Sequence, residues 1–472
     1  MDRFFVDIVR FFQTSYDTLY VFTFVVASFL LFSGFDDIFV DFYYWFFYIF
    51  QRKRLHKYQL LPEEMLRNTP EKSIALFIPT WHEYDVIEQM LMRACKTIQY
   101  TNYDVFVGVY PNDLETTAKV QAVADIYPQV HPVVAGHPGP STKAENLNDM
   151  HQGMIRRENK TGIRYDIIVL HDAEDLIHPL SLKVFNCFVP EYDMVQLPVY
   201  PLVTPHKKIV HWTYCDEFAE NHTKDLMVRQ IFSGFTPSAG VGTAYNRWLI
   251  EFVGTSFARN MFSKSSLTED YDIALRLALG KANLLYLYRP FGLNIATWAY
   301  FPQTFSTAVR QRTRWLIGIC IQSWQNYGWV GDVKFRMTLY RDRKAVITNI
   351  INALAYIVLI YVLLYELAEW GLRNYGELVP IVSKGTLLWD IVLTDTGLML
   401  WRFAHRFLSV SRIYGRKAGL ISVARLPVSN IVNFTATVRA LKQYFVARRA
   451  KKSVVWEKTA HKFPTFDESP AG

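Results

Sequence analysis

The chain has 472 residues, of which 51% are apolar and 16% aromatic, and a formal net charge of +8. This length allows one large soluble domain with membrane segments, or two to three soluble domains. The charge is not a nucleic-acid signature, because it is concentrated between residues 402 and 458, and no recognition motif accompanies it. The four cysteines lie far apart and lack the paired spacing of a zinc or redox site.

An apolar run near the N-terminus is the first predicted element. Residues 19–35, LYVFTFVVASFLLFSGF, are just long enough to span a membrane. Residues 39–50 are shorter and rich in aromatics, which predicts a separate helix lying in the membrane interface. No cleavable signal peptide is evident. The basic cluster at 51–57 places the following residues in the cytoplasm, so residues 1–58 are predicted to anchor the chain.

From about residue 73 the pattern changes to alternating strands and helices. Three buried strands, in SIALFIPTWHE, DVFVGVYPND and YDIIVLHDAED, each run into a polar loop. Parallel strands with crossover helices are the simplest fold for this order. Residues 59–345 are therefore predicted to form a cytosolic α/β domain with a Rossmann-like, mostly parallel sheet, whose ligands bind at the carboxyl ends of the strands.

A second apolar block follows the α/β domain. Residues 347–367 are predicted to span the membrane, and residues 387–403 form a weaker candidate because Asp390 and Asp395 interrupt them. We therefore expect two membrane helices within residues 346–408. Basic flanks on both sides of this block agree with three spans in all and a periplasmic N-terminus.

The remainder, residues 409–472, is predicted to be a basic cytoplasmic tail. Residues 402–458 hold thirteen Lys and Arg against one acid, Glu457, which is typical of a segment close to anionic lipid headgroups. Within the tail, residues 422–449 are predicted to form an amphipathic helix near the membrane, with Pro427 close to its start.

The third strand ends in the acidic sequence Asp172-Ala173-Glu174-Asp175. Carboxylate oxygens are hard ligands that suit a divalent cation, and such a cation can neutralise a diphosphate leaving group. Asp172 and Glu174 are the predicted ligands, with Asp175 as an alternative to Glu174 or a third ligand. An acidic loop at a strand end is more often a solvated turn, so this motif alone is weak.

A second candidate group is Thr268-Glu269-Asp270, directly before an amphipathic helix. Asp270 can serve as a general base that deprotonates an attacking hydroxyl. The simpler interpretation is that Thr268 caps the helix and that the acids favour its first turn. Both interpretations can hold together.

Further polar residues follow the first two strands and precede the third. Glu83 and Asp113 could hydrogen-bond a base and a ribose, and Lys143 could reach a phosphate. In the later sequence TAVRQRTRWLIG, Arg314 could hold a leaving diphosphate, and Trp315 could stack on the apolar face of a sugar. The alternative for that sequence is a membrane-surface helix.

In order, PTxxE (79–83), YPND, KAENLN (143–148), HDAED, TED and QxxRW (311–315) resemble the inverting family 2 glycosyltransferases with a GT-A fold. The match runs from about residue 70 to 345. The ordered set of motifs is far more specific than any single motif. SGFDDIFVD, HPGPSTKAENLN, PSAGVGTAYNR and the closing VVWEKTAHKFP narrow the resemblance, over nearly the whole chain, to NfrB-type inner-membrane glycosyltransferases, known as bacteriophage adsorption proteins.

This resemblance implies a bacterial inner-membrane, multi-pass enzyme that uses Mg²⁺ or Mn²⁺ and a nucleotide-sugar donor, by analogy a UDP-sugar. It implies a role in making or exporting a surface polysaccharide, with an outer-membrane partner. The residues it implies are, for catalysis, Asp270 and Glu269; for the donor, Pro79, Thr80, Glu83, Asp113, Lys143, Asn146 and Asp172; for the acceptor and diphosphate, Gln311, Arg314 and Trp315; and for the metal, Asp172 and Glu174.

Two departures from the family pattern affect these expectations. Glu174 stands where the wider family usually has Asp, and the gating-loop signature of cellulose synthases does not follow QxxRW, so cellulose is not the expected product. The acceptor stays open between a growing polysaccharide and a lipid phosphate. The alternative from another class is a catalytically silent membrane scaffold or phage-receptor component that keeps the fold.

Overall fold

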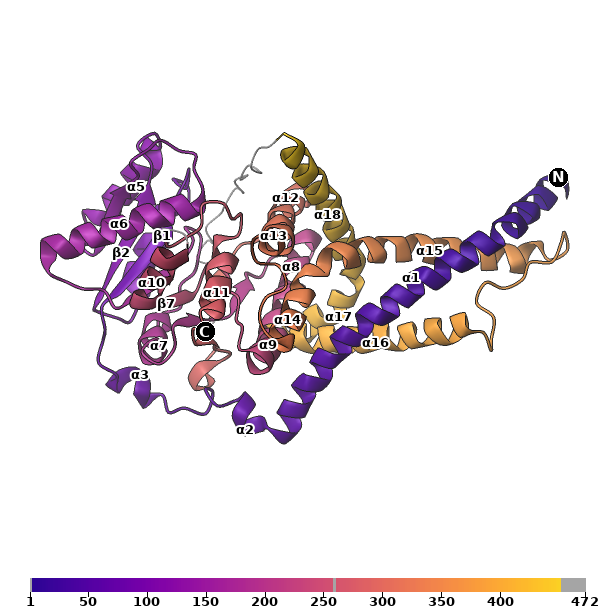
Figure 1. Ribbon diagram of the computed structural model, residues 1–472, viewed down its shortest axis with the longest axis horizontal. Helices are drawn as coiled ribbons and strands as arrows, with labels where there is room; N and C mark the ends of the chain where they lie inside the picture. Colours follow the sequence, from indigo (N-terminus) through magenta and orange to yellow (C-terminus); the bar gives the residue numbers. More distant parts are fainter. Residues whose placement is uncertain (1, 258–259, 451–472) are drawn as a thin grey trace.

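The computed structural model describes residues 2–257 and 260–450, without the side chains of residues 2 and 254–257. An α/β domain forms one end of the molecule, and long helices project from it as a stalk (Figure 1). The closing VVWEKTAHKFP segment and the end of the predicted basic tail lie outside the described residues.

The central sheet has seven strands in the order β3-β2-β1-β4-β7-β5-β8. All neighbouring strands are parallel except for β7, which runs antiparallel to both β4 and β5. A second, two-stranded parallel sheet pairs β6 with β9. The strands are β1 Ile74–Pro79, β2 Tyr103–Val109, β3 Val130–Val134, β4 Ile167–Leu170, β5 Met194–Gln196, β6 Val199–Pro201, β7 Thr243–Asn246, β8 Leu284–Tyr286 and β9 Thr297–Ala299. The predicted, mostly parallel α/β sheet is confirmed.

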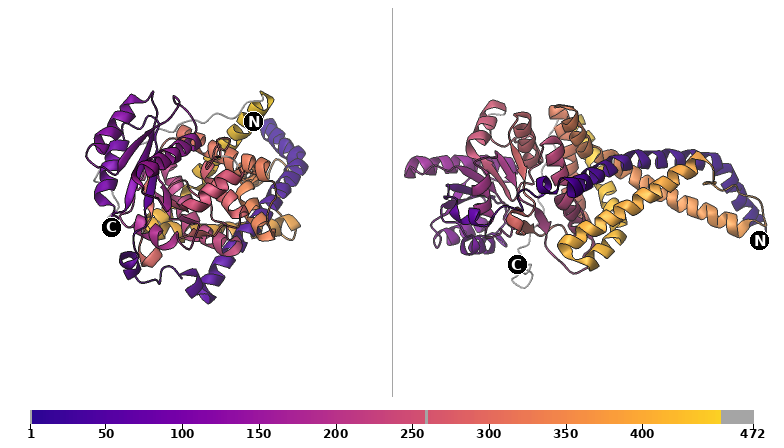
Figure 2. Two further views of the ribbon diagram at one scale, coloured as in Figure 1. Left: turned by 60° about the vertical axis from the view of Figure 1, so that its left-hand side comes forward. Right: turned by 90° about the horizontal axis from the view of Figure 1, so that it is seen from below.

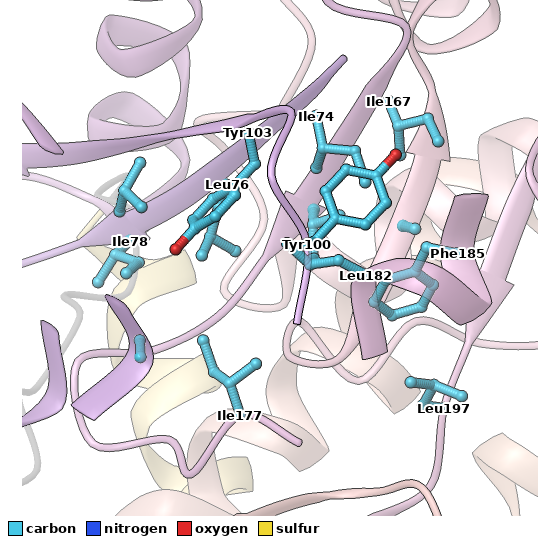
Figure 3. Packing of buried hydrophobic residues seen from close by; sticks show 14 of the residues in the cluster. Ile74, Leu76, Ile78, Tyr100, Tyr103, Ile167, Ile177, Leu182, Phe185 and Leu197 are labelled. Atoms are coloured by element: carbon cyan, nitrogen blue, oxygen red, sulfur yellow. The ribbon is translucent and has the colours of Figure 1, made fainter. Parts of the chain in front are cut away.

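Both faces of the sheet are buried, because successive side chains of a strand point to opposite sides. Along β1, Ile74, Leu76 and Ile78 enter one apolar core (Figure 3), whereas Ala75 and Phe77 enter the other. Continuous apolar runs such as IALFIP are typical of strands covered on both faces.

Helices cover the two faces of the sheet. The first face is covered by α4 (Ile87–Thr97), α5 (Leu114–Ala124) and α7 (Ser181–Phe188), and the second by α6 (Lys143–Thr161), α10 (Arg247–Phe257), α11 (Glu269–Leu279) and α14 (Val333–Arg343). The remaining short elements are α2 Arg52–Leu55, α3 Glu64–Asn68, α8 Ile209–Glu220, the π-helix η1 Asn221–Asp225, α9 Leu226–Ser233, the 3-10 turn η2 Pro290–Gly292, α12 Phe305–Trp315, the π-helix η3 Leu316–Gln322 and α13 Ser323–Tyr327.

The N-terminal helix α1 is unbroken from Asp2–Phe50. This differs from the expected pair of a spanning helix and a separate interfacial helix. The reason is that no proline interrupts the run, and Gly34 is accommodated inside the helix, where an added Cβ would lie 2.7 Å from Leu398 Cδ1. The interfacial placement of residues 39–50 stays a prediction.

The stalk contains α1, α15 (Ala345–Leu372) and α16 (Leu387–Tyr414), which extend together beyond the α/β domain in both figures (Figures 1 and 2). Among the described residues, two helices are long and apolar enough to cross a membrane, α1 over Arg3–Phe50 and α15. The predicted third span falls in α16, where Asp390 and Asp395 lower the hydropathy, and it stays a prediction.

The chain after the stalk returns to the α/β domain as α17 (Arg416–Ala424) and α18 (Leu426–Arg449). Pro427 lies in the first turn of α18, where a missing N–H costs nothing, as predicted for the start of this helix. Arg425, between the two helices, is buried and holds Asp216 of α8 through two hydrogen bonds of 2.7 and 2.5 Å. These bonds fix the C-terminal helices on the α/β domain.

Candidate active site

A cavity of about 640 Å³ opens at the carboxyl ends of β1, β2 and β4. All predicted site residues but Asp113 line it: Pro79, Thr80, Glu83, Lys143, Asn146, Asp172, Glu174, Glu269, Asp270, Gln311, Arg314 and Trp315. The structure therefore brings together motifs that are up to 236 positions apart in the chain, from Pro79 to Trp315.

Asp113 lies beside the cavity and does not line it. Its side chain caps α5 by accepting from the backbone N–H of Thr116, and it also accepts from the N–H of His82 at 2.6 Å. The carboxylate is 2% exposed. In this arrangement Asp113 holds the loop after β1 against the loop after β2, and direct contact with a donor stays a prediction.

Asn146 also acts on the backbone of the strand ends. Its amide donates to the carbonyl oxygens of Thr80 and Gly108, at 3.4 and 3.3 Å. Gly108 is required there, because an added Cβ would lie 1.8 Å from Asn146 Oδ1. The first turn of α6 is thereby fixed against β1 and β2, with Lys143 at its start.

Lys143 is the central cation of the cavity. Its Nζ lies 2.5 Å from Asp172 Oδ1 and 4.0 Å from Glu269 Oε1. Burial disfavours the charged amine, but the attraction of Asp172 and Glu269 is greater and raises the pKa of Lys143. The lysine thus links the acidic loop after β4 to the Glu269 carboxylate at the start of α11.

The acidic loop after β4 is held from behind by a buried pair. His171 Nδ1 lies 2.8 Å from Asp175 Oδ2, and the same oxygen accepts from the N–H of Asp172 at 2.9 Å. Burial raises the pKa of Asp175, partly offset by the hydrogen bond to His171. One carboxylate oxygen of Asp175 is therefore occupied by hydrogen bonds within the loop, whereas the Asp172 side chain is about one-third exposed.

The Thr268-Glu269-Asp270 segment begins α11, but Thr268 does not cap it through its side chain. The expectation of side-chain capping is wrong. Within the described residues, Thr268 Oγ1 is buried without a hydrogen-bond partner, and an added Cβ on Gly318 would lie 2.3 Å from it. Thr268 instead packs on the π-helix η3, which directly follows Trp315.

Glu269 and Asp270 form a buried acidic pair. Burial raises the pKa of Glu269 to about 7, and the charge of Asp270 adds to this effect, whereas Lys143 and Arg314 oppose it. Burial also raises the pKa of Asp270, again against Lys143. A carboxylate with a raised pKa is a stronger base, as proton abstraction near neutral pH requires.

Gly240 faces Asp270 from the loop before β7. Its φ is +74°, in the left-handed region that glycine tolerates, and an added Cβ would lie 2.7 Å from Asp270 Oδ2. This glycine lets the backbone come close to the acidic pair without a side chain in the cavity.

Trp315 ends α12 beside aromatic residues of α8. Its ring centroid lies 6.0 Å from Tyr214 and 6.2 Å from Phe218. Gln311, one turn earlier, has its Oε1 buried with no hydrogen-bond partner in the described part of the chain. A buried acceptor atom without a partner at the wall of a cavity is available to a ligand hydroxyl.

Sequence reasoning missed other residues that line the cavity. Trp81 and Tyr110 lie inside the PTWHE and YPND motifs, and their rings contact edge-to-face at 5.1 Å, so the motifs already contained their signal. Tyr300, Phe301, Asn349 and Asn433 also line the cavity, but they carry no local motif. They come from distant segments that packing places there.

The carboxylates of Asp172 and Glu174 suit a divalent cation whose remaining ligands come from a bound substrate and water. No cluster of three or more His, Cys, Asp or Glu suited to a metal is found in residues 2–257 and 260–450. Asp172 and Glu174 nevertheless both line the cavity at one strand end. Mg²⁺ and similar ions are commonly held by one or two carboxylates with substrate phosphates and waters, so two carboxylates are sufficient.

The chain matches known proteins along most of its length. Bacteriophage adsorption protein B of Escherichia coli (strain K12) and bacteriophage N4 adsorption protein B of Escherichia coli O157:H7 are each 36% identical to it over 468 residues. The match covers 95% of this chain and 62% of each relative, so the chain spans less than two thirds of their length. The predicted resemblance to these adsorption proteins is confirmed.

Among solved structures, the mannosyltransferase PcManGT from Pyrobaculum calidifontis, in complex with GDP-Man and Mn²⁺, has a TM-score of 0.50 at 15% identity. The alignment covers 87% of this chain and 99% of that chain, and it shows a shared fold. A family model described as "Glycosyltransferase like family 2" matches residues 70–318. The chain therefore has a GT-A fold and belongs to the family 2-like glycosyltransferases.

Proposed function

We propose that the enzyme transfers a sugar, with inversion, from a nucleotide-sugar donor to a saccharide acceptor at a membrane surface. The observation that carries this proposal is the convergence of Asp172, Glu174, Asp270, Lys143 and Arg314 on one cavity. This set combines metal ligands, a base and cations for a diphosphate, which transfer from a sugar nucleotide requires together.

The donor would lie at the strand ends. Trp81 and Tyr110 offer aromatic faces to the nucleotide base, and the loop after β1, with Thr80 and Glu83, offers polar groups to the ribose. A UDP-sugar is the proposed donor. The Mn²⁺ bound with GDP-Man in PcManGT supports a divalent ion here as well.

Asp172 and Glu174 would hold Mg²⁺ or Mn²⁺, which would neutralise charge on the donor diphosphate. We favour Glu174 over Asp175, because Asp175 already accepts two hydrogen bonds within the loop. Lys143 and Arg314 would bind the phosphate oxygens, and Lys143 would exchange its contact with Asp172 for one with the donor.

Asp270 would take the proton of the acceptor hydroxyl while its oxygen attacks the anomeric carbon from the side opposite the diphosphate, which inverts that carbon. Glu269 would keep the basicity of Asp270 high, because two carboxylates close together disfavour ionisation of both. Gly240 leaves room for the acceptor next to Asp270.

The acceptor half of the cavity suits a neutral saccharide. Phe218, Tyr300, Phe301 and Trp315 provide aromatic faces, and amide side chains line the same cavity. Two cations of this half are already paired: Arg229 Nη1 donates to Asp342 Oδ1 at 2.7 Å, and Arg312 Nη1 lies 2.7 Å from Glu217 Oε2. Arg314 also lines this half and is assigned here to the donor diphosphate, so a lipid-phosphate acceptor would have to compete with the donor for it.

The membrane location rests on α1 and α15. The proposed placement is the bacterial inner membrane, with the α/β domain in the cytoplasm beside the basic cluster at 51–57. The phage adsorption relatives support a role at the cell envelope. We propose a part in synthesis or export of a surface polysaccharide, with an outer-membrane partner.

The decisive experiment uses Asp270→Asn in the full chain, purified in nanodiscs. Release of nucleoside diphosphate is followed with a panel of UDP-hexoses, UDP-N-acetylhexosamines and GDP-mannose, in the presence of Mn²⁺. The variant should lose about 10²–10⁴-fold in turnover, because general base catalysis contributes that much, while its affinity for UDP is retained. Asp125→Asn, an exposed substitution at the end of α5, is the matched control.

Equal turnover in the Asp270→Asn variant and the wild type would refute the assignment of the base. The second candidate, a catalytically silent scaffold, predicts no release by the wild type from any donor, even in membranes that contain its native partners. The intact carboxylates around the cavity favour the enzyme.

A further inference from the structure

Helix α18 has a stripe of large apolar side chains on its outer, exposed face. Ile431, Val438 and Phe445 recur every seven residues and are 54%, 48% and 55% exposed. The face that packs on the protein consists of Val432 and of small residues, among them Ala436 and Ala440 at 0% and 1% exposure. Exposed apolar stripes of this kind mark contact with another apolar phase.

The charge of this region selects an anionic partner. Neither α17 nor α18 contains an acidic residue, whereas Arg416, Lys417, Lys442, Arg448 and Arg449 are exposed cations. Basic residues beside an apolar stripe are the pattern of a helix that lies in the headgroup region of an anionic bilayer.

The position of α18 is consistent with a bilayer surface. It crosses the base of the stalk at a steep angle to α15 (Figure 1). Asn349 and Tyr356 of α15 make hydrogen bonds of 3.0 and 2.9 Å to Thr437 and Asn430 of α18. A membrane crossed by α15 therefore brings its surface to α18.

The inner face of α18 holds the helix that carries Gln311, Arg314 and Trp315. Asn433 accepts from Arg312 Nη1 at 2.7 Å, and the backbone oxygen of Ala436 accepts from Thr313 at 3.3 Å. Arg312 also pairs with Glu217 of α8 and lies 4.5 Å from the ring centre of Tyr214. Movement of α18 would therefore move α12.

We propose that α18 lies on the anionic surface of the membrane and that this contact fixes α12 at the acceptor half of the cavity. The inference rests on the proposed membrane location, but not on the identity of donor or acceptor. It assigns the outer face of α18 to lipid headgroups and makes Asn433 a positioning residue for α12.

The first test measures the depth of α18 with an environment-sensitive fluorophore on single added cysteines, Val438→Cys and Phe445→Cys, in the full chain. The chain without an added cysteine gives the background, because its native cysteines are buried or half-buried. In phosphatidylglycerol-containing nanodiscs, doxyl-labelled lipid should quench both labels. Leu363→Cys on α15 is the positive control, and Leu114→Cys on α5, 74% exposed, is the negative control.

Quenching at 363 but not at 438 and 445 would overturn the inference and leave the membrane location intact. Loss of quenching at 363 as well would overturn the location itself. These two failures are therefore distinguishable.

The second test measures hydrogen–deuterium exchange in α12, which needs no substrate. Phosphatidylglycerol should slow exchange there relative to pure phosphatidylcholine. Lys442→Glu, Arg448→Glu and Arg449→Glu together should remove this difference, since each basic residue near an anionic surface contributes about fivefold in binding. The control changes Lys96, Arg156 and Lys160, which are exposed on α4 and α6, to Glu together. This control variant should keep the difference in exchange between the two lipids. Equal exchange in the two lipids would refute the positioning role.

Discussion

The two halves of the cavity are built in different ways. The donor half consists of strand ends and the first turn of α6, and its side chains are held by backbone contacts such as those of Asn146 with Thr80 and Gly108. The acceptor half consists of four helices that are separated in the sequence and joined by side-chain contacts such as that of Arg312 with Asn433. The sheet gives the donor half its rigidity, whereas the acceptor half depends on how α8, α12, α15 and α18 pack.

This difference implies that substitutions in the donor half should abolish nucleotide binding, whereas those in the acceptor half should leave it intact. Lys143, at the start of α6, and Gly318, in η3, lie at the border, because each contacts the Thr268–Asp270 segment. Four substitutions or conditions test this division.

The largest effect is expected for Asp172→Ala, which removes a proposed metal ligand and the partner of Lys143. We expect loss of Mn²⁺-dependent UDP binding and a fall of about 10³-fold in turnover, or ~4 kcal/mol. Calorimetric titration with UDP, with and without Mn²⁺, checks the first part. Tight, metal-dependent UDP binding by the variant would contradict the assignment of Asp172 to the metal site of the donor half.

Gly318→Ala should be next, because its Cβ would lie 2.3 Å from Thr268 Oγ1. Overpacking of this kind costs about 1–3 kcal/mol, so we expect a lower melting temperature and slower turnover. Thermal unfolding in nanodiscs measures the change, and Gly371→Ala on α15, where nothing lies within 4 Å, is the control. The two variants should differ in stability; equal melting temperatures would contradict the close contact.

Trp315→Ala should reduce transfer by about 10–100-fold, because an aromatic contact with a sugar is worth ~1–3 kcal/mol. UDP affinity should be unchanged, since Trp315 lies among Tyr214 and Phe218 of α8. Titration with UDP and a nucleotide-release assay on the same preparation separate the two quantities. A matched loss of UDP affinity would show that the halves are not separable at this residue.

The smallest effect is the dependence on pH. The pKa of Glu269 is raised to about 7, so below that pH this carboxyl is protonated and its charge no longer raises the basicity of Asp270, and turnover should fall towards a lower plateau. Above pH 7 the rate should level off. Glu269→Gln removes the neighbouring negative charge, so the fall in turnover at acid pH should occur at a lower pH. A fall that stays at the same pH would exclude coupling within the pair.

The same division explains what could be predicted from sequence. The strand-end motifs around Glu83 and Asp172, together with the motif around Asp270 at the start of α11, identified the GT-A fold and most of the cavity, because parallel strands bring their carboxyl ends to one edge. Asn349 and Asn433 could not be predicted, since only the packing of α15 and α18 on α12 places them there.

Some local expectations failed for reasons of context. Thr268 makes no capping bond, because η3 packs on its hydroxyl. A short apolar segment at residues 39–50 looked like an independent helix, yet α1 continues through it, since helix length is set by the absence of a break more than by hydropathy.

The contact between Gly318 and Thr268 has a consequence for exchanging parts between related enzymes. Through this single pair of residues, the segment that carries Asp270, the proposed base, packs on the helix that follows Trp315, the proposed sugar contact. A chimaera that takes its acceptor helices from another enzyme would therefore need glycine at this position, whatever sugar those helices recognise. The two halves of the cavity can pack together here because Gly318 has no side chain.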